Sequence, residues 1–390
     1  MRSLMRRHLE NPESTSMKVF HCDHCNRVVF FENVQSVGCK RKLAYAPDLS
    51  DICSFDQVDE IRWKSPSAIA NGKLYRLCTN YARENVCNWA IPDDDPNTLC
   101  AACRLNLVIP DLSIAGHREL WRRLEAAKRR LVCTLLKLHL PLKNRIEDPQ
   151  CGLGFQFMAD TPENKIIFTG HSQGIITINV AEADDVEREK RRVSLGEPFR
   201  TLLGHFRHES GHYYWERLVK DSNRLEEWRR LFGNEQEDYG KSIQNHYSRV
   251  PSSDWPERFV SVYASAHPWE DWAETWAHYL HMVDTLEMAA ACGLCLQPGR
   301  SDEPSLKPLA EDITNRAATF DLLIDNWLAV TYVLNNLNRA LGQRDGYPFV
   351  LSTMVIEKLR FVDETVRQFT PPNSKEKKRQ KTGTKLHSSR

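Results

Sequence analysis

The residues best suited to chemistry form the motif His208-Glu209-Ser210-Gly211-His212. On a helix, His208 and His212 are one turn apart on the same face, so both imidazoles can bind one Zn²⁺. Glu209 lies beside them and can accept a proton from a metal-bound water. The alternative is a surface helix that carries two histidines by chance. The segments that follow in the chain favour the metal site.

A second helix offers candidates for the third protein ligand that such a zinc ion needs. Pro268 suits the first turn of a helix, and Glu270 and Glu274 then lie one turn apart on one face. Aromatic and alanine residues around them predict that this helix is buried. Because two buried carboxylates are costly without partners, we expect them to contact the metal and a metal-bound histidine. The residues alone leave open which glutamate has which role.

Cysteine pairs near the N-terminus predict a different kind of metal site. The chain has 12 cysteines, and eight of them precede residue 104. Because the chain opens with no secretory signal peptide, the C-x-x-C spacings favour zinc-bound thiolates in a reducing compartment over disulfides. One set is complete for a tetrahedral ion, and it consists of Cys78, Cys87, Cys100 and Cys103.

The first cysteine set is incomplete. Cys22, Cys25 and Cys39 supply three thiolates, but the position expected for the fourth, three residues before Cys39, is Ser36. Serine is a poor zinc ligand, so we expect either weak binding or a substitute ligand. The candidates for that substitute are Cys53, His21 and His24.

We expect the cysteine region to have a structural role, because zinc holds together small regions that bury little apolar surface. The alternative is recognition of a protein or nucleic acid, but the nearby cations do not form a dense basic patch. These cations are Arg62, Lys64, Lys73 and Arg76. Nucleic acid is therefore an unlikely partner. A late pair, Cys292-x-x-Cys295, has no second pair nearby, so we expect two free thiols or a chance spacing and not a metal site.

Apolar periodicity predicts the elements that position these residues. A long amphipathic linker helix is expected over 114–140, and a helical segment from Phe199 onward carries the histidine motif. Three β-branched runs predict a small sheet, with strands over 155–158, 166–169 and 175–180. Further helices are expected over 225–232, 238–247, 320–341 and 349–369. The charged run 184–192 predicts an exposed loop or helical turn.

Two other histidines are not expected to bind the metal. His171 lies between two predicted strands, which favours a loop position. His205 precedes His208 by three residues and could face the metal, but a packing role or a contact with a ligand is favoured.

The histidine motif followed by Glu270-Asp271-Trp272-Ala273-Glu274 resembles the gluzincin metallopeptidases. This resemblance implies that Glu270 is the third zinc ligand and that Glu274 orients a ligand histidine. It also implies that Tyr263, seven residues before Glu270, stabilises the oxyanion. An exchange of roles between Glu270 and Glu274 remains open.

Residues 17–369 resemble a family of zinc-binding metallopeptidases with an N-terminal zinc ribbon. The matching pieces are Cys22-x-x-Cys25, Phe30-Phe31-Glu32-Asn33, Cys87-Asn88-Trp89, Cys100-x-x-Cys103, the segment His205–His212, and Tyr347-Pro348-Phe349-Val350. The family usually has a cysteine where this chain has Ser36. The resemblance implies an α+β fold, with a zinc-ribbon region over 17–110 and a mostly helical zincin-like domain with a small β-sheet over 111–373.

The implied function is zinc-dependent peptide-bond hydrolysis, with one catalytic zinc and one or two structural zincs. The alternative is a non-catalytic zinc-ribbon module that binds protein or nucleic acid on a zincin-like scaffold. The substrate is a peptide or protein that the sequence does not identify, and the oligomeric state is likewise not indicated.

Composition adds a few limits. The net charge is +1, so no overall field steers the chain to nucleic acid or membrane. No apolar run is long enough to span a bilayer, and we expect an intracellular protein. The cytoplasm is favoured, and the nucleus stays open as the alternative. The polar ends, 1–16 and 374–390, are expected to be disordered.

Overall fold

The computed structural model describes residues 19–161, 167–248, 250–296 and 319–369. Its N-terminal part is a five-stranded antiparallel sheet in the order β1-β2-β3-β4-β5. These strands are β1 (Lys42–Ala46), β2 (Asp51–Gln57), β3 (Arg62–Lys64), β4 (Leu74–Leu77) and β5 (Ala90–Pro92), with the short helix α1 (Thr79–Ala82) between the last two. The predicted tails 1–16 and 374–390 lie outside the described residues.

A second sheet of four strands has the order β6-β7-β9-β8. Its strands are β6 (Asn106–Val108), β7 (Gly154–Met158), β8 (Gly170–Ser172) and β9 (Ile175–Asn179). Strands β6, β7 and β9 are parallel, whereas β8 runs antiparallel to β9. Strand β6 lies inside the range 17–110 that we predicted for the ribbon, although it pairs with β7. The limits of the two domains stay a prediction.

The strand predicted over 166–169 is wrong, because the strand in this part of the chain is β8. Ile166 is outside the described residues, and Ile167 to Thr169 form no strand. The Asn179 side chain donates to the carbonyl of Ile167 at 2.8 Å, and its backbone N–H donates to the Thr169 hydroxyl at 3.2 Å. Contacts of this kind replace a backbone ladder there. Pairing with β9 begins only at Gly170.

Ten α-helices are assigned in the described part of the chain. Besides α1 they are α2 (His117–Lys137), α3 (Asp185–Ser194), α4 (Leu202–Leu218), α5 (Leu225–Phe232), α6 (Tyr239–Ser248), α7 (Trp255–Arg258), α8 (Pro268–Ala291), α9 (Phe320–Ala340) and α10 (Thr353–Arg367). The fold is therefore α+β, with a stranded N-terminal region and a mostly helical remainder, as predicted. No described helix has the length and apolar content needed to cross a lipid bilayer.

The charged run that we predicted as a loop or a single turn is in fact the ten-residue helix α3. The Asp184 side chain caps it by accepting hydrogen bonds from the backbone N–H groups of Val186 and Glu187. Ion pairs three residues apart then line its surface, for example Lys190 with Glu187 at 2.6 Å. A cap and such pairs each stabilise a helix that lacks a buried face.

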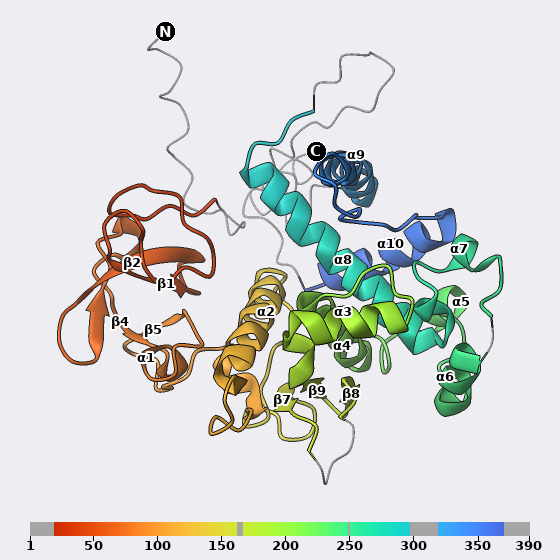
Figure 1. Ribbon diagram of the computed structural model, residues 1–390, viewed down its shortest axis with the longest axis horizontal. Helices are drawn as coiled ribbons and strands as arrows, with labels where there is room; N and C mark the ends of the chain where they lie inside the picture. Colours follow the sequence, from red (N-terminus) through yellow and green to blue (C-terminus); the bar gives the residue numbers. More distant parts are fainter. Residues whose placement is uncertain (1–18, 162–166, 249, 297–318, 370–390) are drawn as a thin grey trace, which may run out of the picture.

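Helix α2 stands between the N-terminal sheet and the other helices (Figure 1). On the ribbon side, the Arg129 guanidinium donates to the Val86 carbonyl at 2.6 Å. On the opposite side, the Thr134 hydroxyl bonds to Asp284 of α8, and Lys137 pairs with Glu287. The same helix therefore connects the N-terminal cysteine-rich region to the helix that carries Glu270 and Glu274.

Helices α4 and α8 pack closely against each other. The Trp272 indole donates to the Gly211 carbonyl at 2.8 Å, and the Trp276 indole donates to the Ser210 hydroxyl at 3.1 Å. Both indoles are fully buried. A Cβ at Gly211 would lie 2.9 Å from the Cα of Ala273, so glycine permits the approach of the two backbones.

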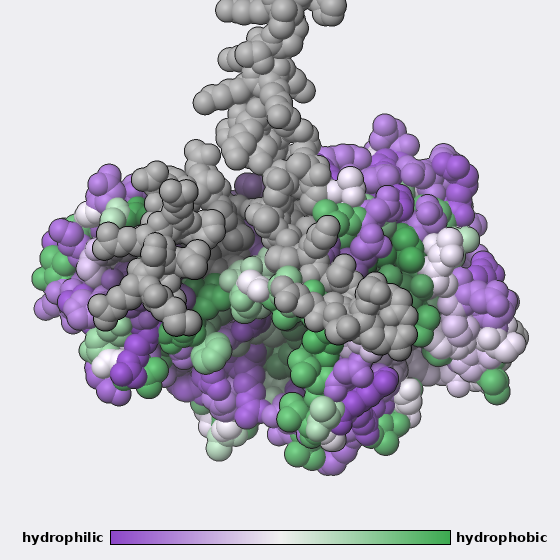
Figure 2. Space-filling model, turned by 90° about the horizontal axis from the view of Figure 1, so that it is seen from above, coloured by the Kyte–Doolittle hydropathy of each residue, from purple (hydrophilic) through white to green (hydrophobic). Residues whose placement is uncertain are grey.

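Hydrophobic residues also reach the surface. Seen from above, they are visible mainly in the middle of the face, and hydrophilic residues dominate its upper right edge (Figure 2). On α9, the exposed apolar side chains include Leu328, Tyr332 and Leu337. Such scattered exposure is normal for a folded protein surface.

The contact at Gly211 gives a first prediction. Gly211→Ala should destabilise the protein by about 1–3 kcal/mol, because the added methyl group overpacks the α4–α8 contact. The control is Gly240→Ala in α6, where the nearest atom to a new Cβ is a side-chain oxygen of Asp238 at 3.6 Å. Chemical denaturation of both variants measures the difference. Equal stabilities would show that the helices do not depend on glycine here.

Candidate metal centre

Helix α4 brings the two histidines of the motif to one point. The side chain of Thr201 caps the helix by accepting a hydrogen bond from the Gly204 N–H at 3.0 Å. His208 and His212 follow farther along the same helix, and their Nε2 atoms are 3.3 Å apart. Both side chains are largely buried, with exposed fractions of 13% and 15%. The paired nitrogens therefore face the same small volume.

Helix α8 brings Glu270 to the same place. Its Oε2 lies 3.0 Å from His208 Nε2 and 3.6 Å from His212 Nε2. Ligands on a tetrahedral zinc with bonds of about 2.0–2.1 Å are about 3.3–3.4 Å apart, so the three donor separations suit one ion. Glu270 Oε2 is buried and has no hydrogen-bond donor of suitable geometry. A metal ion would satisfy this oxygen, and these residues therefore fit zinc.

Glu274 contacts the opposite edge of His208. Its Oε1 lies 2.7 Å from His208 Nδ1, and its Oε2 accepts a hydrogen bond from the Ser261 hydroxyl at 2.8 Å. A proton on Nδ1, shared with this carboxylate, leaves the Nε2 lone pair free for a metal. The geometry thus brings Glu270 to the metal side of the histidines and Glu274 to their outer side.

Glu209 is buried beside the histidine pair, with an exposed fraction of 6%. Burial raises the pKa of its carboxyl, while the positive charges of His208 and His212 oppose that rise. A carboxylate with a raised pKa holds a proton more firmly than an exposed one does.

Two tyrosines border the centre. Tyr263, in a 3₁₀ turn (Tyr263–Ser265), has its ring centroid 5.9 Å from that of His208. Burial, followed by the charge of Glu270, raises the pKa of the Tyr263 phenol, so the hydroxyl stays protonated. Tyr239, the first residue of α6, donates to Glu270 Oε1 at 2.8 Å. Our sequence reasoning missed both Tyr239 and Ser261, because neither belongs to a motif with a recognisable spacing.

The two other histidines remain outside the group of ligands. His171 lies in strand β8, so its predicted loop position is wrong. Its ring stacks on that of His212, with centroids 6.2 Å apart, and its Nε2 accepts from the Gly174 N–H at 3.0 Å. His205 Nε2 lies 3.3 Å from Glu182 Oε2, so this side chain pairs away from the metal position.

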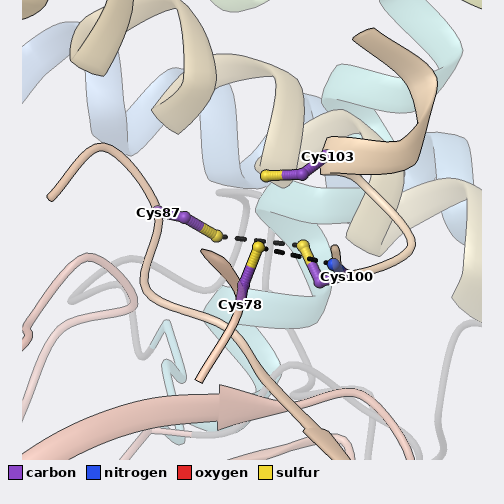
Figure 3. Close-up of side chains that lie close together, drawn as sticks. All are labelled: Cys78, Cys87, Cys100 and Cys103. Carbon is purple, nitrogen blue, oxygen red and sulfur yellow. Dashed lines mark hydrogen bonds between the residues drawn. The ribbon is translucent and has the colours of Figure 1, made fainter. Parts of the chain in front are cut away.

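The second cysteine set forms a closed, buried cluster (Figure 3). The sulfurs of Cys87 and Cys100 are 3.8 Å apart, and the Cys100 N–H donates to Cys78 Sγ at 3.4 Å. Zinc–sulfur bonds of about 2.3 Å place tetrahedral sulfurs about 3.8 Å apart. With Cys103, whose side chain is also buried, the cluster has the composition and spacing of a structural zinc site.

The first set is a group of three thiols, Cys22, Cys25 and Cys39. None of the substitutes that we considered for the missing ligand, Cys53, His21 and His24, belongs to this group within the described residues. Cys53 lies in β2, and burial raises the pKa of its thiol to about 12. The side chain that does reach the group is Ser36, whose Oγ is 3.3 Å from Cys25 Sγ. Cys292 and Cys295 are both exposed, and neither belongs to a group of metal ligands in the part of the chain that the structure describes.

Comparisons with known proteins give one match for the helical part of the chain and one for its N-terminal cysteine-rich part. Residues 117–365 match the family described as "Putative zinc-binding metallo-peptidase", and residues 19–114 match a zinc-ribbon domain. No solved structure gives a significant match.

Three mycobacterial relatives have similar lengths. They are the uncharacterized proteins Mb2598c of Mycobacterium bovis and MT2644 and Rv2568c of Mycobacterium tuberculosis. Each is 40% identical over 365 residues, which cover 92% of this chain and 99% of the relative. By its match to this family over residues 117–365 and its zinc-ribbon match over residues 19–114, the chain belongs to the family of zinc-binding metallopeptidases described in this way.

Proposed function

We propose that this protein hydrolyses peptide bonds as a zinc metallopeptidase of the gluzincin type. The observation that supports this most strongly is the convergence of three donor atoms, on His208, His212 and Glu270, at separations suited to one zinc ion. When bound, zinc supplies a Lewis acid and makes a water molecule more acidic. The substrate class is a peptide or protein.

Glu209 is the proposed general base. It lies beside the histidines in a buried position that raises the pKa of its carboxyl. It can therefore accept a proton from the attacking water and hold it until the leaving amine takes it. The buried position also excludes bulk water, which would otherwise compete for the proton.

Tyr263 is the proposed oxyanion donor, since its ring borders His208 and its hydroxyl stays protonated. A fixed donor aimed at the developing negative charge stabilises the transition state more than the ground state. Tyr239 is proposed to have a different role. Its hydroxyl bonds to Oε1 of Glu270 and orients the carboxylate, so that Oε2 faces the histidines.

Glu274 and Ser261 are proposed to position His208. The chain of contacts runs from the Ser261 hydroxyl through the Glu274 carboxylate to His208 Nδ1. Such partners of a ligand histidine fix its ring and tautomer. The four buried cysteines of the second set, which include Cys100, are proposed to hold a structural zinc that has no part in the reaction.

The metal content of two variants tests the centre. The double variant His208→Ala, His212→Ala should lose one zinc per chain, whereas Glu209→Gln should keep that zinc and lose hydrolysis. The control is His205→Ala on the same helix, which should keep the full zinc content because His205 pairs with Glu182. Elemental analysis gives the zinc count, and mass spectrometry of an unbiased peptide mixture gives the cleavage.

Two outcomes would contradict the proposal. If Glu209→Gln cleaves peptides as fast as the unaltered protein, the assignment of the general base is wrong. If the unaltered, zinc-loaded protein cleaves no peptide in the mixture, a non-catalytic binding module on the same scaffold becomes the better explanation.

The two tyrosines should separate in their effects. Tyr263→Phe should lower kcat by about 10²–10³-fold at unchanged zinc affinity, as expected for removal of an oxyanion donor. Tyr239→Phe should weaken zinc binding by about 10–100-fold, as expected when a partner of a metal ligand is lost. Chelator titrations and steady-state kinetics measure the two quantities. Tyr332→Phe, on the exposed surface of α9, is the control, and identical effects of the first two variants would refute the separate roles.

A further inference from the structure

The first cysteine set differs from the second in the residue at its fourth ligand position. Cys22 Sγ and Cys39 Sγ are 3.7 Å apart, close to the sulfur separation expected around zinc. The Ser36 hydroxyl is the oxygen that reaches this group, 3.3 Å from Cys25 Sγ. It also accepts a hydrogen bond from the Cys39 N–H at 3.4 Å. The Ser36 side chain, which has no exposed surface, thus presents a neutral oxygen at the position where a four-cysteine zinc site has a thiolate.

A serine at the fourth ligand position predicts that this site binds a metal ion weakly. A serine hydroxyl is neutral, whereas a cysteine at the same place supplies a negatively charged sulfur, the donor that structural zinc sites prefer. An ion held by three thiolates and a hydroxyl therefore lacks one of the four strong bonds of the Cys78 cluster. With one strong bond missing, release of the zinc ion is expected to be faster, although the three thiolate bonds are still made.

Access from solvent acts in the same direction. Cys25 and Cys39 are partly exposed, whereas all four cysteines of the second set are buried. A chelator or a metal-carrying protein can therefore approach the first set directly. The second set is enclosed by the ribbon and by α2, whose Glu125 lies 3.9 Å from Cys103 Sγ.

We propose that Cys22, Cys25 and Cys39, with the Ser36 hydroxyl as a weak fourth donor, form an exchangeable zinc site, distinct from the permanent zinc of the second cysteine set. The proposal does not depend on peptidase activity. It makes the outer part of the ribbon responsive to available zinc, because the energy of metal binding is also energy for folding that small segment. Release of the ion would loosen the segment around Phe31, whose ring packs edge-on against Tyr45 at 5.1 Å.

Zinc release from the full-length chain tests this directly. The double variant His208→Ala, His212→Ala serves as the background, so that only cysteine-bound zinc is counted. Mixed with the chromogenic chelator 4-(2-pyridylazo)resorcinol, this variant should release one zinc in a fast phase and one in a phase at least about tenfold slower, which corresponds to a difference of about 1.4 kcal/mol in the barrier to release. Ser36→Cys in this background should move the fast zinc into the slow phase, and Cys39→Ala should abolish the fast phase.

A matched control and a second measurement keep the outcomes distinct. Ser172→Cys adds a thiol at the exposed end of strand β8 and should leave both phases unchanged. Hydrogen exchange should show that partial zinc removal speeds exchange in residues 19–41 and leaves residues 78–103 protected. Two results with the background variant, in which Ser36 is present, would overturn the proposal. One is that it binds only a single cysteine-held zinc. The other is that it releases both zincs as slowly as the Ser36→Cys variant does.

Discussion

The candidate centre depends on how closely two helix backbones approach each other. Gly211, within the histidine motif, lets α4 lie against Ala273 of α8, and the indole of Trp272 fixes that contact through the Gly211 carbonyl. The histidines and the glutamates come from different helices, so their separation is set by this packing. A side chain at Gly211 would push the helices apart and would increase the distances between the donor atoms.

Buried charge explains why the residues around the centre occur together. Glu270 is buried and Glu274 is largely buried, and an unpaired carboxylate is costly in such a position. Glu274 is hydrogen-bonded on both oxygens, to His208 and Ser261, whereas Glu270 accepts from Tyr239 on Oε1 and leaves Oε2 facing the histidines without a hydrogen-bond donor. The contacts that hold these carboxylates also orient two imidazole nitrogens toward the free oxygen of Glu270. Stability and a metal-ready geometry therefore have the same physical origin.

The zinc ribbon is connected to this centre through α2. Arg129 reaches the ribbon backbone, while Thr134 and Lys137 bind the far end of α8. The buried cysteine cluster packs against the same helix, through the contact between Cys103 and Glu125. A small region stabilised by metal can thereby hold α2 in place, and α2 in turn supports the helix with the proposed ligand Glu270. These contacts explain how the ribbon can have the structural role expected for it, because they connect it through α2 to α8.

The sequence by itself determined the local features. Helical spacing predicted that His208 and His212 share a face, and cysteine spacing predicted the cluster completed by Cys103, because both depend on residues close in the chain. Only the tertiary structure decided which oxygen faces the histidines, and it favours Glu270, with Glu274 behind His208. It also revealed Tyr239, which no spacing rule connects to the site. In both misassigned segments, side-chain contacts outweighed the local pattern. The pattern was β-branched at 166–169, where Asn179 contacts the backbone, and charged in α3, where Asp184 caps the helix.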